Sequence, residues 1–248
     1  MTNVAIGYLS DGNTKDNFTY SLARLMLWET GRMGMPPFLF RERCSIDVWA
    51  GRNNVTASFL DECDAEWLCF IDSDMGFGPD AIERLIESAD PEKRPIVGAL
   101  CFGLRRQASD TTIMAERFLT FPTIYEWVEQ DDEAGFRVVS DYPDDTLMLS
   151  AATGAAFLLI HRSVLETMRE ARGDTWWTRV THPKRTDPFG EDMSFCIHAA
   201  ASDFPIHVNT AVKTSHDKGG VVLTEEVWQA QQALIELGSL KGEVKRAS

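Results

Sequence analysis

The sequence has no long apolar run, and no stretch approaches the roughly 20 apolar residues that a membrane-spanning helix requires. Its first residues, MTNVAIGYLSDGNTKD, lack the basic region and long apolar segment of a secretory signal. Internal repeats, low-complexity segments and a Gly/Ser/Pro-rich linker are also absent from the sequence. These absences predict one continuous globular unit over residues 1–248, located in the cytoplasm.

Cysteines are scarce, and basic residues are outnumbered. The five cysteines are scattered, and none forms a C-x-x-C pair, which predicts reduced core thiols rather than a zinc site or disulfides. Lys and Arg total 24 against 38 for Asp and Glu, and the net charge is −14. Because phosphate neutralisation drives general nucleic-acid binding, this charge argues against a broad nucleic-acid-binding surface. The cysteines are Cys44, Cys63, Cys69, Cys101 and Cys196.

The first hundred residues alternate apolar runs with segments of helical periodicity. Hydrophobic residues make up 44% of the chain, which is enough for a sizeable core. Such alternation is typical of a mainly parallel sheet with helices on both faces, and it predicts an α/β fold. The expected strands are 4–10, a short run after Pro36, 67–74 and 95–102, and the expected helices are 16–30, 52–63 and 79–88.

The second half predicts a different arrangement. The segment TIYEWVEQDDEAGFRVVSDY is typical of a hairpin with its turn near Gly135, so we expect a small second sheet or hairpin here. Further strands, a helix and a long aromatic and charged loop follow. A last strand ends near His216, and a terminal helix precedes the solvated tail KGEVKRAS.

Asp72 and Asp74 follow the apolar run WLCFI. Ligands of open α/β sheets bind outside the carboxyl ends of the strands. In extended geometry residues i and i+2 point to the same side, so both carboxylates would converge on one hard cation. The alternative is a strand that runs into an acidic turn. Burial of the strand favours the cation site, because a divalent ion with a diphosphate would balance the charge.

Other polar groups stand at the expected strand ends and helix starts. Ser10 and Asp11 end the first strand and suit a base or ribose, or they form a simple loop. Arg52 and Asn53 open a helix, where the guanidinium and backbone N–H groups suit phosphate, although such an arginine is usually just solvated.

The late part of the chain offers a base, a further metal ligand and two aromatic rings. Glu191 or Asp192 is a candidate general base, or an acid favoured by a helix N-terminus. His216 is a candidate third metal ligand, or a structural histidine. Trp176 and Trp177 predict stacking on a sugar or base, or packing of their loop onto the core.

Taken together, these segments resemble a nucleotide-sugar-dependent glycosyltransferase of the GT-A fold, closest to family 2. The match covers roughly residues 1–220 in order, and it implies a Rossmann-like sheet. It also implies a donor-binding half over 1–103, an acceptor and catalytic half over 104–223, and a terminal helix and tail over 224–248. The matching segments are 51–60, 70–86, 95–102, 152–166, 189–199 and the final Ser-His at 215–216.

The resemblance also implies roles for individual residues. In such enzymes the aspartate pair holds Mn²⁺ or Mg²⁺ on the donor diphosphate, with Asp74 as the direct ligand and Asp72 shared between the ribose and the metal. His216 matches a further metal ligand, and Gly154 matches a glycine whose missing side chain admits the sugar. Arg52 and Asn53 match a nucleotide-binding segment, and one residue of the Glu191–Asp192 pair matches the base of inverting members.

The resemblance implies a hexosyltransferase-like enzyme that uses a UDP- or GDP-sugar. The Q-x-x-R-W motif and membrane helices of processive synthases are absent, which favours transfer of a single sugar to a soluble acceptor. The compact chain is similar to bacteriophage-encoded members. A protein, a glycan and a modified nucleic-acid base all remain open as acceptors. The alternatives are a nucleotidyltransferase, whose usual glycine-rich basic loop is missing after the first strand, and a non-catalytic nucleotide-sugar-binding module.

Overall fold

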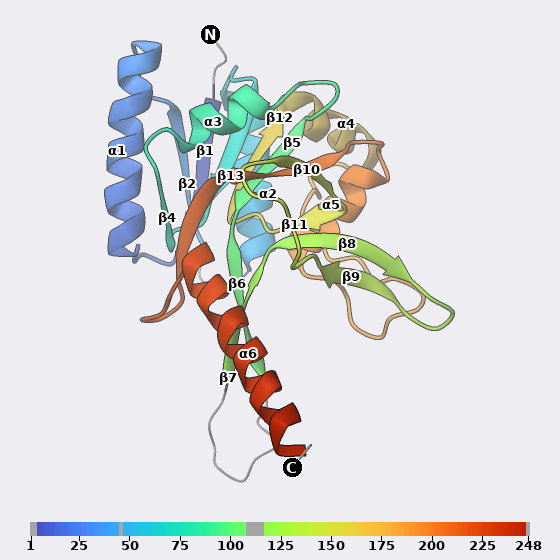
Figure 1. Cartoon of the computed structure of the whole chain (residues 1–248). Helices are drawn as coiled ribbons and strands as arrows, with labels where there is room; N and C mark the ends of the chain where they lie inside the picture. The colour runs from blue at the N-terminus through green and yellow to red at the C-terminus, as the bar shows by residue number, and fades with distance from the viewer. Residues whose placement is uncertain (1–3, 45–46, 108–116, 247–248) are drawn as a thin grey trace.

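The computed structural model describes residues 4–44, 47–107 and 117–246 (Figure 1). Its elements are a central sheet, flanking helices and smaller β-structures. In chain order they are β1 (Val4–Ser10), α1 (Asp16–Met33), β2 (Phe38–Arg43), α2 (Val48–Glu62), β3 (Trp67–Ile71), β4 (Met75–Phe77), α3 (Ala81–Ser88), β5 (Ile96–Leu100), β6 (Phe102–Gln107), β7 (Arg117–Pro122), β8 (Ile124–Glu129), β9 (Ala134–Val138), β10 (Leu147–Ser150), β11 (Ala152–Thr153), β12 (Phe157–His161), α4 (Arg162–Arg172), α5 (Glu191–Ala200), β13 (Ile206–Asp217), β14 (Val222–Leu223) and α6 (Glu225–Arg246).

The central sheet has nine strands, and its main path runs β10-β13-β5-β12-β3-β1-β2. Strands β1, β2, β3, β5 and β13 run in one direction, whereas β10 and β12 run in the other. The predicted mainly parallel sheet is therefore confirmed. Strand β12 lies between β3 and β5, so the second half of the chain completes the sheet that the first half begins.

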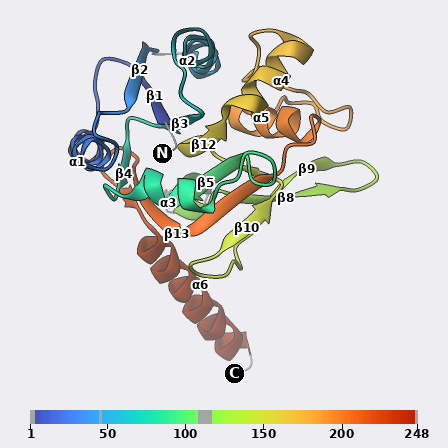
Figure 2. The same ribbon diagram turned by 90° about the horizontal axis from the view of Figure 1, so that it is seen from above.

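Helices cover both faces of this sheet (Figure 2). Helices α2, α4 and α5 pack on one face, and α1 and α3 pack on the other. Strand β3 shows why its sequence is a continuous apolar run. Leu68 and Phe70 face the first group of helices, whereas Trp67, Cys69 and Ile71 face the second. A strand buried on both faces does not alternate between apolar and polar residues.

Two glycines allow α2 to approach β1 closely. A Cβ on Gly7 would lie 2.6 Å from Val55 Cγ1, and a Cβ on Gly51 would lie 3.0 Å from Leu9 Cδ2. The first distance is too short for any real Cβ, so the helix packs directly on the strand backbone. This packing brings the start of α2, and with it Arg52, to the carboxyl end of β1.

The smaller β-structures confirm a separate small sheet in the second half. Strands β11, β8 and β9 form a three-stranded sheet, and β6 pairs with β7. The predicted turn near Gly135 is wrong, because Gly135 lies within β9 and the turn spans Gln130 to Glu133, where the Gln130 N–H donates to the Glu133 carbonyl. Helix α6 contacts β7, and the two extend from the body together (Figure 1).

Four helix termini differ from the expectations. Helix α2 begins at Val48, so Arg52 and Asn53 lie in its second turn and do not open the helix. Helix α1 continues through Gly31 and ends at Gly34, whose left-handed φ of 77° suits glycine. Helix α3 begins at Ala81, so Pro79 precedes the helix rather than opening it. Helix α6 continues to Arg246, so most of the expected solvated tail is helical, and residues 247–248 lie outside the described residues.

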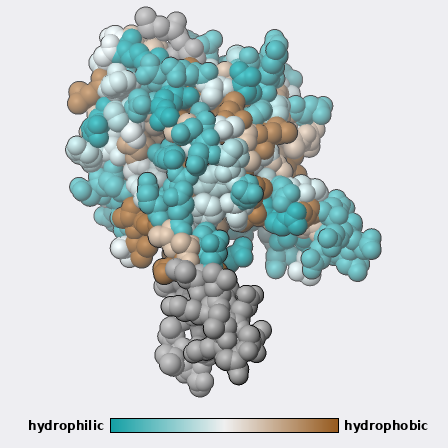
Figure 3. All heavy atoms as spheres, viewed as in Figure 1, coloured by the Kyte–Doolittle hydropathy of each residue, from teal (hydrophilic) through white to brown (hydrophobic). Residues whose placement is uncertain are grey.

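The surface and the cysteines agree with the composition. Hydrophilic residues predominate on the face shown in Figure 3, and hydrophobic residues form small groups there. Within the described part of the chain, no helix combines the length and apolarity needed to cross a membrane. All five cysteines are free thiols; Cys69, Cys101 and Cys196 are buried in the core, whereas Cys44 and Cys63 are only half-buried.

Candidate active site

A cleft of about 690 Å³ lies where the first and third strands end and where α5 begins. Its walls come from the loop after β1, the start of α2, the turn after β3 and the first turn of α5. This is the edge of the sheet where open α/β folds bind ligands. The polar lining residues are Ser10, Asp11, Asn13, Thr14, Lys15, Arg52, Asp72, Ser73, Asp74, Glu191 and Asp192.

Arg52 joins three of these elements from a buried position. Its side chain is 2% exposed, and its guanidinium donates to Asp72 Oδ1 at 3.0 Å, to Glu191 Oε1 at 3.1 Å and to Asp192 Oδ1. Burial alone would lower the pKa of Arg52, but the three carboxylates raise it by more, so the net pKa lies above the usual value. Arg52 therefore fixes the position of all three carboxylates.

Arg52 faces these carboxylates rather than open solvent. The sequence-based interpretation gave it direct contact with phosphate. A phosphate would have to displace Asp72, Glu191 or Asp192 to reach the guanidinium, so its observed contacts are those of a residue that holds acids in place. The N-terminus of α5 supports two of these acids, because Glu191 and Asp192 occupy its first turn.

The predicted acceptor-binding role of Trp176 and Trp177 is wrong. Trp176 and Trp177 are both 0% exposed, and each indole N–H donates within the protein, to the Leu165 carbonyl and to Thr56 Oγ1. Trp177 stacks on Phe195 at 4.3 Å and lies 5.2 Å from the guanidinium of Arg52. Rings buried in the core cannot stack on a sugar, and the ring of Trp177 packs against Arg52 instead.

The side chain of Asn53 also lacks the donor-binding position predicted for it. Its Oδ1 accepts a hydrogen bond from the backbone N–H of Trp177 at 3.1 Å, and its side chain is buried. It does not line the cleft. Asn53 therefore links α2 to the loop between α4 and α5, which contains Trp176 and Trp177. The preceding residue, Arg52, lines the cleft.

Asp74 is positioned by strand β4, which the sequence did not predict. Strand β4 pairs antiparallel with the end of β13, and His216 lies opposite Met75 in the register. The Asp217 N–H also donates to the Asp74 carbonyl at 2.9 Å. A Cβ on Gly76 would lie 2.4 Å from Ser215 Oγ, so glycine at this position allows the close approach of the two strands.

The structure separates the side chains of Asp72 and Asp74. Residues 73 and 74 form a turn, in which the Met75 N–H donates to the Asp72 carbonyl. The backbone is thus not extended there, and the same-side argument for i and i+2 fails. Asp72 contacts Arg52, whereas Asp74 faces His216. Among the described residues, no group of three or more His, Cys, Asp and Glu side chains is arranged to hold a metal ion, so the predicted three-ligand set is not assembled.

The remaining pair, Asp74 and His216, has the features of a two-ligand cation site. His216 is buried, and its Nδ1 lies 2.9 Å from the carbonyl oxygen of Phe102, which can only accept. Nδ1 therefore carries a proton, and in the neutral ring Nε2 is an acceptor. Nε2 lies 3.1 Å from Asp74 Oδ1 and makes no hydrogen bond of good geometry. Two acceptors face each other, so a cation or a second imidazole proton is needed between them.

This spacing fits a divalent ion. Two neighbouring ligands of an octahedral ion with bonds of about 2.1 Å lie about 3 Å apart. Metal-binding histidines commonly donate their other N–H to a backbone carbonyl, as Nδ1 of His216 does here. The second oxygen of Asp74, Oδ2, accepts from Lys218 Nζ at 2.9 Å. Burial raises the pKa of Asp74, but His216, where its ring carries the second proton, and Lys218 lower it by more, to about 2, so the carboxylate is ionised at neutral pH.

Of the other predicted donor-binding residues, Ser10 and Asp11 line the cleft, whereas Gly154 is buried and does not line it. Ser10 and Asp11 both stabilise the loop after β1: the Gly12 N–H donates to Ser10 Oγ, and the Asn13 N–H donates to Asp11 Oδ1. A Cβ on Gly154 would meet Asp192 Oδ2 at 3.7 Å. Gly154 thus lies beside the oxygen of Asp192 that points away from Arg52.

Sequence reasoning missed three side chains near the cleft. Lys15 lines it, Lys218 contacts Asp74, and Trp49, which is 39% exposed, lines a neighbouring pocket together with Glu191. Exposed lysines are common, so neither lysine stood out from the sequence. Trp49 precedes Arg52 by less than one helical turn, and this closeness in sequence was the one feature that could have marked Trp49 as lying near the site.

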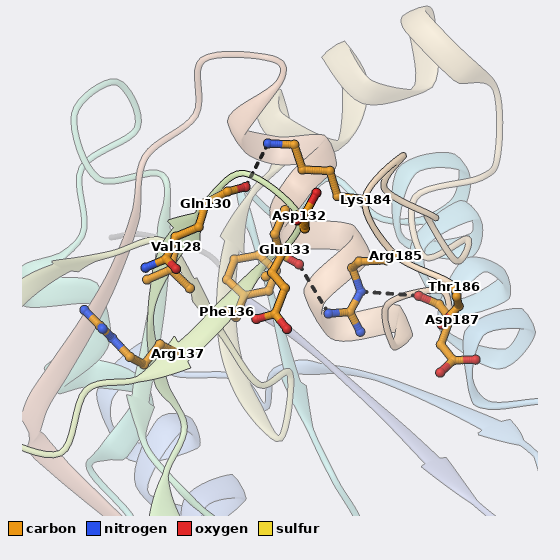
Figure 4. Close-up of a pocket in the computed structure, with 12 residues that line it drawn as sticks. Val128, Gln130, Asp132, Glu133, Phe136, Arg137, Lys184, Arg185, Thr186 and Asp187 are labelled. Atoms are coloured by element: carbon orange, nitrogen blue, oxygen red, sulfur yellow. Dashed lines mark hydrogen bonds between the residues drawn. The ribbon is translucent and has the colours of Figure 1, made fainter.

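A second polar pocket, of about 550 Å³, lies beside the β8–β9 hairpin (Figure 4). Its basic side chains already contact protein oxygens: Lys184 Nζ donates to the Gln130 carbonyl, and Arg185 donates to the carbonyls of Ala134 and Asp187. Lys184 also pairs with Glu129. These contacts link the loop between α4 and α5 to the β8–β9 hairpin.

No family model and no curated protein matches the sequence. Among solved structures, A197 from STIV aligns over 91% of this chain and 91% of its own, with 14% identity and a TM-score of 0.53. A glycosyltransferase involved in the glycosylation of the major capsid of PBCV-1 aligns over 73% and 71% of the two chains, with 12% identity and a TM-score of 0.33. CMP:2-keto-3-deoxy-manno-octonic acid synthetase complexed with CTP aligns over 84% and 89%, with 10% identity and a TM-score of 0.44.

These likenesses concern the fold and not the activity. The alignment with A197 spans nearly the whole of both chains. Together with the strand order, the first alignment agrees with the predicted architecture. The chain has a compact, Rossmann-like α/β fold of the GT-A type.

Proposed function

We propose that the protein is a glycosyltransferase that moves a single sugar from a UDP- or GDP-sugar to an acceptor hydroxyl and depends on Mn²⁺ or Mg²⁺. One observation carries this proposal. Asp74, which forms with the buried His216 an acceptor pair suited to a divalent cation, lines the same cleft as the carboxylates held at the start of α5. Sugar transfer from a nucleotide needs both features, one for the leaving diphosphate and one for the attacking hydroxyl.

The donor half is residues 1–103. Ser10 and Asp11 supply polar atoms for the base or ribose at the end of β1. A divalent cation bound by Asp74 and His216 would neutralise charge on the departing nucleoside diphosphate. Lys15 adds positive charge to the same wall of the cleft. Asp72, which Arg52 holds, is left as a contact for the ribose.

The base is Asp192, with Glu191 as its alternative. Asp192 bonds Arg52 through Oδ1, and its Oδ2 lies on the side of Gly154, where a missing side chain leaves room for a sugar. Glu191 instead also lines the neighbouring pocket of Trp49. A carboxylate held rigidly by Arg52 accepts a proton from the acceptor hydroxyl, which attacks the anomeric carbon opposite the leaving group. The product is therefore inverted.

The acceptor half is residues 104–223, and residues 224–248 form the terminal helix and tail. A protein, a glycan or a modified nucleic-acid base is the acceptor. With Trp176 and Trp177 buried, the exposed ring of Trp49, which lines the same pocket as Glu191, is assigned to contact such an acceptor.

The proposal is tested by ligand-dependent thermal unfolding. UDP and GDP, each with and without Mn²⁺, are added to the protein, and the apparent melting temperature is measured. One nucleotide with Mn²⁺ raises it markedly, since a ligand at about 100 times its Kd adds about 2.7 kcal/mol. AMP with Mn²⁺ is the control and gives little change. If no nucleoside diphosphate stabilises the protein in any condition, the proposal fails.

A further inference from the structure

Lys218 lies at the carboxylate proposed to hold the cation. Its Nζ donates to Asp74 Oδ2 at 2.9 Å, while Asp74 Oδ1 faces His216. Lys218 is 38% exposed, in contrast to the buried His216. Both oxygens of Asp74 therefore face positively charged or chargeable groups before any ligand arrives.

A divalent ion between Asp74 and His216 would change this balance. The ion and the ammonium group of Lys218 would then both contact the carboxylate of Asp74, and two positive charges so close together repel each other. The ammonium group then needs another anion as its partner. In the proposed reaction that anion is the diphosphate of the donor, which binds at the same ion, and ammonium–phosphate hydrogen bonds are charge-assisted.

The local backbone allows the side chain of Lys218 to change partners without unfolding the strand. Lys218 opens the turn between β13 and β14, and its N–H donates to the Val221 carbonyl at 2.8 Å. Gly219 and Gly220 adopt positive φ angles of 70° and 101°, and the Gly220 N–H donates to Asp217 Oδ1. The backbone of the turn is thus held by its own hydrogen bonds, and the flexible lysine stem lies partly in solvent.

A second lysine, Lys15, lies near Asp217, whose N–H donates to the Asp74 carbonyl. Lys15 Nζ lies 3.9 Å from Asp217 Oδ1, and the Lys15 N–H donates to the Ser73 carbonyl. Lys15 and Lys218 therefore lie on two different loops beside Asp74 and Asp217. A dianionic group placed there meets positive charge from both sides.

We propose that Lys218 is a diphosphate-binding residue that Asp74 holds while the site is empty, and that it thereby couples binding of the divalent ion to binding of the nucleoside diphosphate. The inference rests on the proposed function. Mn²⁺ alone competes with Lys218 for Asp74, whereas Mn²⁺ together with a diphosphate releases Lys218 to a better partner. The affinity of each ligand therefore rises when the other is present, by the same factor.

The test is isothermal titration calorimetry of the full chain with Mn²⁺ alone, with UDP or GDP alone, and with the nucleotide in saturating Mn²⁺. In Lys218→Gln, Mn²⁺ alone binds about two- to fivefold more tightly, because an exposed ion pair no longer competes. The nucleotide in Mn²⁺ binds about tenfold more weakly, because a charge-assisted hydrogen bond is lost. A purely structural role for Lys218 would not move the two affinities in opposite directions.

Two further variants sharpen the test. Lys218→Arg keeps the charge and restores most of the coupling between Mn²⁺ and nucleotide. Lys93→Gln removes one exposed lysine beside the amino end of β5, away from the cleft, and leaves both affinities unchanged. If Lys218→Gln shows the wild-type coupling, the inference is overturned while the proposed function stands. If the wild-type protein binds neither Mn²⁺ nor either nucleotide, the proposed function fails, and the inference fails with it.

Discussion

Replacing Asp192 by asparagine is expected to lower the rate of sugar transfer by about 10²- to 10⁴-fold, the usual contribution of a general base. The amide is nearly isosteric, and its oxygen still accepts from the guanidinium of Arg52, so the cluster stays assembled. What is lost is an oxygen that takes the proton of the acceptor hydroxyl. Binding of UDP or GDP in Mn²⁺, measured by calorimetry, should change little, because Asp192 is not assigned a contact with the nucleotide.

Glu191→Gln is the matched control for Asp192→Asn. Both residues lie in the first turn of α5, and both accept a hydrogen bond from Nη1 of Arg52. If Asp192 is the base, Glu191→Gln retains most of the transfer rate. A large loss in Glu191→Gln together with near-normal transfer in Asp192→Asn would move the base to Glu191. Retention of the anomeric configuration in the product would remove the general-base assignment for both residues.

Replacing Arg52 by glutamine is expected to lower the free energy of unfolding by about 3–5 kcal/mol, as for other buried ion pairs that lose one partner. The guanidinium is almost fully buried and compensates three carboxylates, from Asp72, Glu191 and Asp192. An uncharged side chain leaves these carboxylates close together without their shared cation. Urea denaturation of the wild type and the variant, followed by far-UV circular dichroism, measures the difference.

Arg169→Gln provides the control for charge removal alone. Arg169 also contacts two carboxylates, those of Asp61 and Asp174, but these pairs lie at the surface. Its loss is expected to lower the free energy of unfolding by at most about 1 kcal/mol. Arg52→Lys should fall between wild type and Arg52→Gln, because an ammonium group keeps the charge without the planar fork of donors. Equal losses in Arg52→Gln and Arg169→Gln would contradict the structural role given to Arg52.

The sequence was sufficient to predict the general architecture and the edge of the sheet that carries the polar cluster. The run WLCFI has no polar residue because helices cover both faces of β3, and this environment is visible in the residue types alone. Asp72, Glu191 and Asp192 each follow a recognisable strand end or helix start, whereas Arg52 lies in the second turn of α2. Such boundaries are local properties of the sequence.

The details that depend on tertiary contacts were not predictable. Trp176 and Trp177 lie in a polar loop, and their burial follows from how that loop folds over α2 and α5. The different directions of Asp72 and Asp74 depend on a turn and on the pairing of β4 with β13. A three-residue strand is too short to show periodicity. Lys218 gains its significance only from its distance to Asp74.

The most direct measurement is release of nucleoside diphosphate from UDP- and GDP-sugars by the wild-type protein, in Mn²⁺ and in EDTA, with Asp74→Ala alongside. We predict release that requires Mn²⁺ and that Asp74→Ala lowers by at least about 10³-fold, since a catalytic metal contributes several kcal/mol to the rate. Release of pyrophosphate from a nucleoside triphosphate and a sugar, with no nucleoside diphosphate formed from any nucleotide sugar, would instead identify a nucleotidyltransferase. Release that continues in EDTA, or at the wild-type rate in Asp74→Ala, would contradict the metal-dependent transfer proposed for this cleft.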